Sequence, residues 1–323
     1  MKTFLIVAGI VLAVLILLLF IICGFIYNQI VWRKTIKIPK FITNIIAGND
    51  MAMDHYEEDA HRAEAILLTR ITRTEEYISD NGEKLILRVV EPEKSNGRLI
   101  LACHGARSWG VGEFCFISDY FYKNGYTVIM PDHRGCGNSD GKYMGYGTHE
   151  SVDTFYWVNY AKQHYPNMDI FLLGVSMGAA TVLMMSKNAA DDAIKGIIAD
   201  CSYTSAWDEF SYQLKTSFHL PDFPILNICN LYSRMIAGYS FKEASPLNAV
   251  KEAKKPILFI HGGKDDFVPT YMEKILYDAC CTEKEMLVVE NAIHARSYYT
   301  NPDAYQKAIE SFMDKYSKTK SRV

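Results

Sequence analysis

The stretch DIFLLGVSMGAATVLM, residues 169–184, constrains the fold more than any other part of this chain. An apolar run of strand length ends at Gly174, and a second apolar run of helical character begins at Met177. Ser176 stands in the turn between them, with Gly178 close behind it. Glycines, which have no Cβ, are needed where a strand and a helix meet this closely. The pattern therefore predicts a serine at the carboxyl end of a buried strand and at the start of a helix.

Strands and helices alternate along most of the chain around this turn. Continuous apolar runs such as RLILACHG and KPILFIHGG are typical of strands buried on both faces, and stretches such as EFCFISDYFYKNG between them are long enough for helices. This alternation predicts an α/β fold with a mostly parallel, twisted sheet covered by helices on both faces. A hairpin signal at Asn81-Gly82, between two β-rich runs, adds an antiparallel edge.

Residues 204–255 interrupt the alternation between two expected core strands. Ordinary connections are much shorter, and long ones tend to be lids or binding elements, so we expect a small helical lid here. The segment is rich in aromatic residues: Trp207, Phe210, Tyr212, Phe218, Phe223, Tyr232, Tyr239 and Phe241. We interpret them as the packing face of the lid, with an apolar substrate pocket as the alternative.

Residues 4–27 carry no charge and are almost entirely apolar. About 20 such residues span a bilayer core as a helix. The run is longer than the apolar part of a signal peptide and lacks an A-x-A-like cleavage site. The sequence thus predicts a single-pass membrane protein, with an anchor over residues 1–34 and the lipid bilayer as a partner of residues 4–27.

The side of the membrane stays open. Lys2 precedes the span and Arg33, Lys34, Lys37 and Lys40 follow it, which favours a cytoplasmic location for the C-terminal domain. The eight cysteines show no disulfide framework and also suit a reducing compartment. Against this, exported enzymes are commonly held outside the cell by N-terminal anchors.

The rest of the chain divides into a helical connector at 35–74 and a main α/β domain at 75–323, which includes the expected lid at about 204–255. The composition is 49% hydrophobic and 22% charged with a formal net charge of -3, as in ordinary globular domains. A chain without a basic excess gives no reason to expect a nucleic-acid partner. Nothing in the sequence indicates an oligomeric state.

A serine hydroxyl needs a base that a third group holds in place. His294 follows the last expected strand, and either Asp265 or Asp266 follows the strand before it. The order Ser, Asp, His is the one expected when these residues stand at the carboxyl ends of successive parallel strands. The N–H groups of Met177 and Ala106 are the expected oxyanion donors, because one follows the serine and the other follows the strand that ends in His104-Gly105.

Six motifs together resemble the α/β-hydrolase superfamily: CHGARSWG, PDHRGCGNSDG, GVSMGA, ADCSYTS, HGGKDDFVP and NAIHARSY. They cover residues 80–318. More narrowly, the chain is similar to membrane-anchored bacterial hydrolases of the serine aminopeptidase S33 and Bem46-like kind. The resemblance implies a triad of Ser176, Asp265 and His294, and so favours Asp265 over Asp266. Arg107-Ser108-Trp109 departs from the small residues often found after the H-G pair.

We expect a serine hydrolase of the carboxylesterase or lipase type, which cleaves a small-molecule ester or acyl substrate through an acyl-enzyme. A serine peptidase or an acyltransferase would use the same triad, and a membrane-tethered binding protein without activity is the remaining alternative. Glu209 and Asp222 in the lid are the acids that a peptidase would use for a free amino terminus. The absence of H-E-x-x-H, C-x-x-C and phosphate-loop motifs gives no support for a metal or a nucleotide cofactor. His104, His133 and His261 are interpreted as structural histidines in turns.

Overall fold

The computed structural model describes residues 1–35 and 55–317. Its centre is an eight-stranded sheet in the order β1-β2-β4-β3-β5-β6-β7-β8. The strands are β1 (Arg73–Ile78), β2 (Lys84–Val90), β3 (Arg98–Cys103), β4 (Thr127–Pro131), β5 (Asp169–Val175), β6 (Ile194–Asp200), β7 (Ile257–Gly262) and β8 (Lys284–Val289). Only β2 runs against its neighbours, and the other pairings are parallel. The predicted α/β fold with an antiparallel hairpin at one edge is confirmed.

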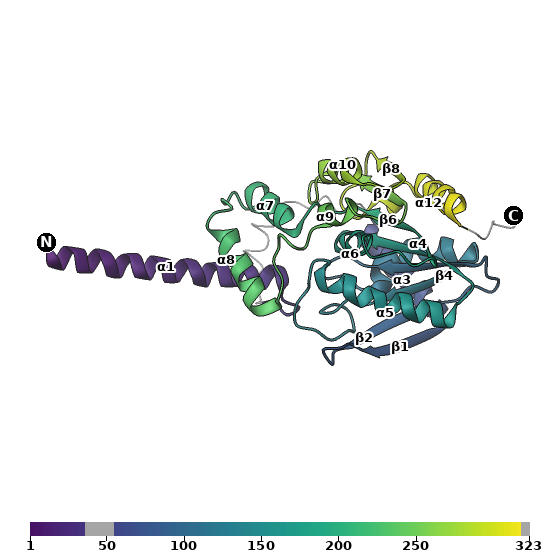
Figure 1. Ribbon diagram of the computed structural model, residues 1–323, viewed down its shortest axis with the longest axis horizontal. Coiled ribbons are helices and arrows are strands. Elements are labelled where there is room, and N and C mark those ends of the chain that lie inside the picture. The colour runs from purple at the N-terminus through teal and green to yellow at the C-terminus, as the bar shows by residue number, and fades with distance from the viewer. Residues whose placement is uncertain (36–54, 318–323) are drawn as a thin grey trace.

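Helices cover both faces of the sheet (Figure 1). One face carries α5 (Thr148–His164), α6 (Met177–Met185) and α10 (Thr270–Ala279). The other carries α3 (Tyr56–Arg70), α4 (Gly110–Lys123) and α12 (Pro302–Tyr316), with the short α11 (Ser297–Thr300) before it. Every residue of β3 and β5 is buried between these layers, which explains why both strands are continuous apolar runs.

The segment between β6 and β7 is helical and lies beyond the carboxyl ends of the strands (Figure 1). It contains α7 (Ala206–Thr216), α8 (Ile225–Tyr232), a π-helical turn η1 (Ser233–Ala237) and α9 (Pro246–Val250). Phe210, Tyr239 and Phe241 are buried within it, whereas Phe218 and Phe223 are 47% and 76% exposed. Its aromatic residues therefore divide into a packing set and a surface set.

The helix α1 (Lys2–Val31) projects from the domain on the side of the lid (Figure 1). Its mean hydropathy reaches 3.5 over 18 residues, so by length and composition it is a candidate membrane span. The last turns are different: Cys23, Tyr27 and Val31 are buried in one apolar cluster with lid residues. The end of α1 is thus part of the protein core. Of the expected connector, residues 36–54 lie outside the described residues.

Two glycines allow β5, α6 and β3 to meet. A Cβ on Gly174 would lie 2.2 Å from the carbonyl oxygen of Gly178, and a Cβ on Gly178 would lie 1.9 Å from that of Cys103. Both obstacles are backbone atoms, which cannot rotate away as a side chain can. The glycines flanking Ser176 are therefore required by backbone packing at the point where the strand becomes the helix.

Gly178→Ala should strongly destabilise the protein. Alanine in a helix gains about 1 kcal/mol over glycine, but overpacking against backbone costs about 3 kcal/mol or more. We expect a clear fall in the thermal unfolding midpoint of the full chain in detergent. Gly24→Ala is the matched control, because a Cβ there meets only the Tyr232 ring at an ordinary 3.7 Å. Equal midpoints for the two variants would contradict this reading of the turn.

Candidate active site

Ser176 caps the start of α6 in a conformation that few non-glycine residues adopt, with φ 55° and ψ -116°. The strain is held in place on both sides: its N–H donates to the carbonyl of Asp200 at 2.9 Å, and its carbonyl accepts from Ala180 at 3.0 Å. Such strain persists only where the surroundings fix it. The turn thus presents the Ser176 hydroxyl beyond the end of the sheet, as the sequence pattern predicts.

Three residues far apart in the sequence meet at this turn. The Nε2 atom of His294 lies 2.9 Å from the Ser176 hydroxyl, and its Nδ1 atom lies 2.8 Å from the Asp265 carboxylate. His294 is held in the loop after β8, and Asp265 in the loop after β7. The imidazole therefore bridges a hydroxyl and a carboxylate, which is the arrangement needed for a base to accept the serine proton.

Asp265 and its neighbour Asp266 have different surroundings. Asp265 is buried, and its Oδ1 atom accepts from the N–H groups of Phe267 and Val268 at 3.1 and 2.8 Å. Burial raises the pKa of this carboxyl, but contacts with His261 and His294 outweigh it and leave the pKa below its usual value. Asp265 is therefore an anion next to the imidazole. Asp266 is exposed.

His261, interpreted from the sequence as a structural residue, contacts the same carboxylate. Its Nε2 atom lies 2.8 Å from the Val268 carbonyl and 3.3 Å from Asp265, and its Nδ1 atom lies 3.6 Å from Glu273. Burial lowers the pKa of His261, but these two carboxyl groups raise it to about 10. A cationic His261 thus helps to keep Asp265 ionised. No motif signals this contact in the sequence.

His104 and His133 form a separate buried pair below the turn. The backbone N–H of His133 donates to the His104 ring at Nε2, at 2.8 Å. Burial lowers the pKa of both rings, so both are neutral. The nearby Asp132 joins the loops by accepting from Gly110 N–H at 3.0 Å and by pairing with Arg88 at 2.9 Å. This group fixes the loop that follows β3.

The loop after β3 lies directly against the serine. A Cβ on Gly105 would be 3.4 Å from Ser176 Cβ, and the Gly105 N–H donates to Glu113 at 3.0 Å. Ala106 follows at the surface of this loop, and Met177 begins α6. In the described part of the chain neither of these two N–H groups has a hydrogen-bond partner. Unpaired backbone N–H groups next to a serine are what stabilisation of an oxyanion requires.

The unusual residues after Gly105 connect the loop to other parts of the molecule. Arg107 has a positive φ of 61° and donates to the carbonyls of Gln29 and Ile30 at the end of α1, the second at 3.3 Å. Trp109 lies under the guanidinium group of Arg88, 5.1 Å from the ring centroid. The loop that carries Ala106 is therefore fastened to the N-terminal helix.

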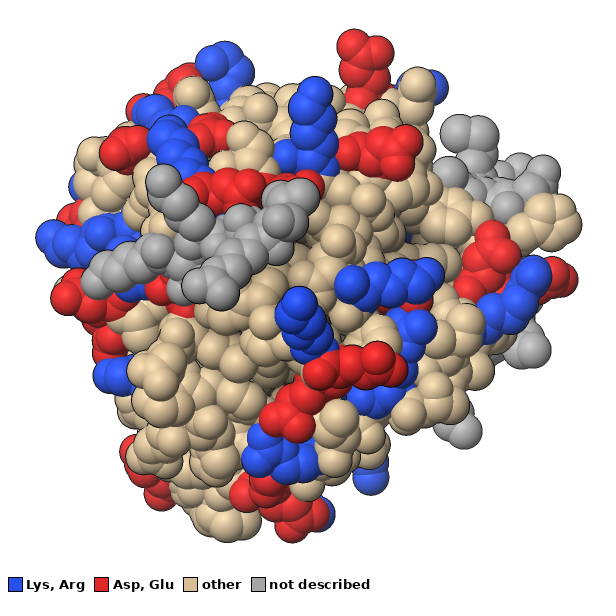
Figure 2. Space-filling view, turned by 90° about the vertical axis from the view of Figure 1, so that its right-hand side faces the viewer, with Lys and Arg blue, Asp and Glu red and all other residues tan. Residues whose placement is uncertain are grey.

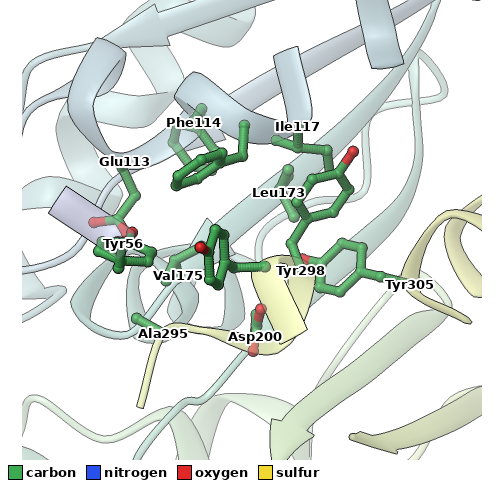
Figure 3. Close-up of a pocket in the computed structure, with 12 residues that line it drawn as sticks. Tyr56, Glu113, Phe114, Ile117, Leu173, Val175, Asp200, Ala295, Tyr298 and Tyr305 are labelled. Atoms are coloured by element: carbon green, nitrogen blue, oxygen red, sulfur yellow. The ribbon is translucent and has the colours of Figure 1, made fainter. Parts of the chain in front are cut away.

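A cavity of about 40 Å³ lies behind the triad, between α4 and α11 (Figure 3). Val175 and Ala295, which adjoin Ser176 and His294, form part of its wall, and Tyr56, Glu113 and Tyr298 surround it (Figure 3). One water needs about 10–15 Å³ of such space, so there is room for a few water molecules and none for a long acyl chain.

Cys201, Asp265 and His294 present possible metal ligands within 4.8 Å of one another. Their chemistry does not suit a metal. Thiols bind metals as thiolates, and burial raises the pKa of Cys201 well above its usual value. Both nitrogens of His294 are also engaged, with Ser176 and Asp265.

The two lid acids have partners within the lid. Glu209 is 3% exposed and accepts from Gln213 at 3.0 Å. Burial raises its pKa to about 8, so it is uncharged at neutral pH. Asp222 pairs with Lys215 at 2.6 Å and accepts from Ser211 at 2.9 Å. Neither offers a free anion for a substrate amine.

Glu209→Gln should become increasingly stable relative to the wild type as pH rises. The native protein keeps a proton on Glu209 that the unfolded chain releases above about pH 4.3. Wild-type stability therefore falls up to about pH 8, by at most about 1.4 kcal/mol per unit. The glutamine variant lacks this slope. Thermal unfolding over a pH series measures the difference, with the exposed Glu252→Gln as control. If the difference in stability between Glu209→Gln and the wild type did not change with pH, Glu209 would not be a buried neutral carboxyl group.

Comparison with known proteins agrees with this architecture. A family model described as the alpha/beta hydrolase fold matches residues 98–220. A Bacillus subtilis protein, described as the uncharacterized protein YqkD, is 32% identical over 216 residues, which cover 67% of this chain and 70% of that one. An uncharacterized membrane protein of Saccharomyces cerevisiae is 24% identical over 73% of this chain and 77% of its own. An esterase structure from Pyrococcus furiosus superposes with a TM-score of 0.63 at 21% identity, over 78% of this chain and 93% of that one.

Proposed function

This chain belongs to the α/β-hydrolase superfamily, and on that premise we propose that it is a membrane-anchored serine hydrolase that cleaves esters through an acyl-enzyme. The observation that carries the proposal is the His294 imidazole, which lies within hydrogen-bond distance of both the Ser176 hydroxyl and the Asp265 carboxylate. A strained serine whose hydroxyl contacts an oriented base is the arrangement of a nucleophile, and a structural serine does not require it.

In the first half of the reaction, Ser176 attacks the ester carbonyl while His294 Nε2 takes its proton. The Asp265 anion holds Nδ1–H and stabilises the imidazolium that forms. The N–H groups of Met177 and Ala106 stabilise the oxyanion, each with about 3–4 kcal/mol. The imidazolium then protonates the leaving alcohol. In the second half, His294 takes a proton from the water that attacks the acyl carbon. It returns this proton to the Ser176 oxygen as the bond to the acyl group breaks and the carboxylic acid leaves.

The surroundings favour an ester over a peptide with a free amino terminus. Such a peptide would need an anion for its ammonium group, and both candidate acids are occupied, since Glu209 is neutral and Asp222 pairs with Lys215. An acyltransferase would share every step up to the acyl-enzyme. It would differ only in the second nucleophile, and comparing water with added alcohols as acceptor distinguishes the two.

We also propose that residues 1–34 anchor the enzyme in a bilayer. The support is the length and apolar composition of α1, together with the description of the yeast relative as a membrane protein.

The test is to label the full chain, in detergent, with a fluorophosphonate probe and to map the adduct by mass spectrometry. We expect the adduct on Ser176, and hydrolysis of at least one member of a panel of esters of increasing chain length. A folded protein that takes no probe and hydrolyses no ester would contradict the proposal and would favour a tethered binding protein.

A further inference from the structure

The lid exposes a set of apolar side chains that no other part of it covers. They lie in the connection from α7 to α8, at the end of α8 and in η1. We call this set the lid face: Phe218, Leu220, Phe223, Leu231, Met235 and Ile236. The most exposed are Phe223 at 76% and Met235 at 74%. A water-facing surface rarely gathers so many large apolar side chains unless it contacts something.

The helix α8 fixes the lid face against α1. The Tyr232 hydroxyl donates to the Phe20 carbonyl at 3.1 Å, and its ring lies 5.9 Å from that of Tyr27. The Cys229 thiol contacts the Cys23 carbonyl at 3.5 Å. Figure 1 shows α8 crossing α1 near the end at which α1 enters the domain. These contacts fix the position of α8, which carries Leu231 and leads into η1, along α1.

That position coincides with the expected edge of the bilayer. Most side chains of α1 are exposed up to Ile22, although Leu19 already packs partly against the domain, and Cys23 is the first that is fully buried. At about 1.5 Å per residue, residues 4–22 span about 28 Å, which matches a hydrocarbon core of about 30 Å. Tyr232 contacts α1 at this boundary, where tyrosine side chains are favoured. Tyr232 is close in the chain to three members of the lid face, Leu231, Met235 and Ile236.

An exposed aromatic side chain beside His294 is connected to the lid. Phe267 is 51% exposed, and its ring lies 4.9 Å from that of His294. The Phe267 carbonyl accepts from Gln213 in the last turns of α7, which also leads into the stretch with Phe218 and Leu220. Phe267 therefore links the end of α7 to the side of His294, whereas the cavity lined by Val175 and Ala295 is too small for an acyl chain.

We propose that the lid face lies in the headgroup and acyl boundary of the bilayer that α1 spans, so that the site takes its substrate, a lipid-like acyl ester, directly from the membrane. This rests on the proposed anchor and ester hydrolysis. Charge agrees with this orientation, because the exposed Arg234 precedes Met235 in the chain and an arginine at such a boundary can pair with lipid phosphates. The end of the domain away from α1 carries interspersed acidic and basic side chains instead (Figure 2).

The experiment uses the full chain in phospholipid nanodiscs and the double variant Met235→Asp, Ile236→Asp. Two substrates are compared, a long-chain ester dissolved in the bilayer and a water-soluble short-chain ester. We expect turnover of the bilayer ester to fall by about tenfold or more, because two charges oppose seating at the interface. Hydrolysis of the soluble ester and fluorophosphonate labelling should stay unchanged. Leu68→Asp, at a position 49% exposed on α3, is the matched control and should change neither substrate.

A second measurement does not depend on activity. Met235→Cys, made in a Cys281→Ser background because Cys281 is the exposed thiol among the described cysteines, carries an environment-sensitive fluorophore. We expect quenching by lipids with nitroxide-labelled acyl chains and little quenching by iodide. Strong quenching by iodide with little quenching by lipid overturns the proposal, and so does energy transfer between two labelled copies without lipid quenching. In the first experiment, the proposal is overturned if the double variant hydrolyses the bilayer ester and the soluble ester at the same ratio of rates as the wild type. A wild-type protein that shows neither ester hydrolysis nor probe labelling would refute the proposed hydrolase activity instead. The quenching result would still decide whether the lid face contacts the bilayer.

Discussion

Replacing Ser176 with alanine should lower kcat/KM for ester hydrolysis by a factor on the order of 10⁵ to 10⁶. The hydroxyl lies 2.9 Å from His294 Nε2, and alanine leaves that base without a nucleophile to activate. The backbone bonds that hold the turn do not involve the side chain, so the thermal unfolding midpoint should change little. Initial rates on a soluble ester and one unfolding scan for each protein suffice.

Ser151→Ala is the matched control for this variant. Its hydroxyl donates to the Thr148 carbonyl on α5, away from the triad, and its loss should leave the rate intact. Retained hydrolysis in a folded Ser176→Ala protein would remove the turn after β5 from the mechanism.

Asp265→Asn should lower kcat/KM by about 10⁴, whereas Asp266→Asn should have almost no effect. An amide in place of the Asp265 carboxylate can offer an N–H to His294 Nδ1, which turns the imidazole to the wrong tautomer and removes the anion that stabilises the imidazolium. Asp266 is exposed and adjacent in sequence, so each variant controls for the other. A larger loss for Asp266→Asn than for Asp265→Asn would overturn the assignment.

Much of the fold could be predicted from local patterns. Strands buried on both faces, such as β3 and β5, leave continuous apolar runs, and the Asn81-Gly82 turn marks the hairpin between β1 and β2. The turn at Ser176 can be predicted equally well, because only glycine fits where backbones approach so closely. These features depend on neighbours in the sequence.

The choice between Asp265 and Asp266 shows where local patterns stop. Consecutive residues in a loop point in different directions, and the direction depends on the loop's contacts with the rest of the fold. The N–H groups of Phe267 and Val268 turn Asp265 inward, and nothing in the spacing reveals that. The contact of His261 with the same carboxylate cannot be predicted for the same reason, since it joins side chains that the sequence alone does not orient.

The run at residues 4–27 shows a different difficulty. A side chain facing lipid and one facing a protein core are equally apolar, so hydropathy does not separate them. Cys23 and Tyr27 belong to this run, yet they are buried against the domain. For the same reason, the sequence does not predict the hydrogen bond between Arg107 and the end of the same helix.

The burial of Cys23, Tyr27 and Val31 has a consequence for how the enzyme is made. The segment of α1 is synthesised first and the lid much later. These side chains therefore lack their packing partners until most of the chain has been synthesised. We therefore expect the packing of the lid around the end of α1 to be a late step of folding. A chain in which that packing has not formed would lack part of its apolar core, and the loop beside Ser176 would not be held by the contact between Arg107 and the end of α1.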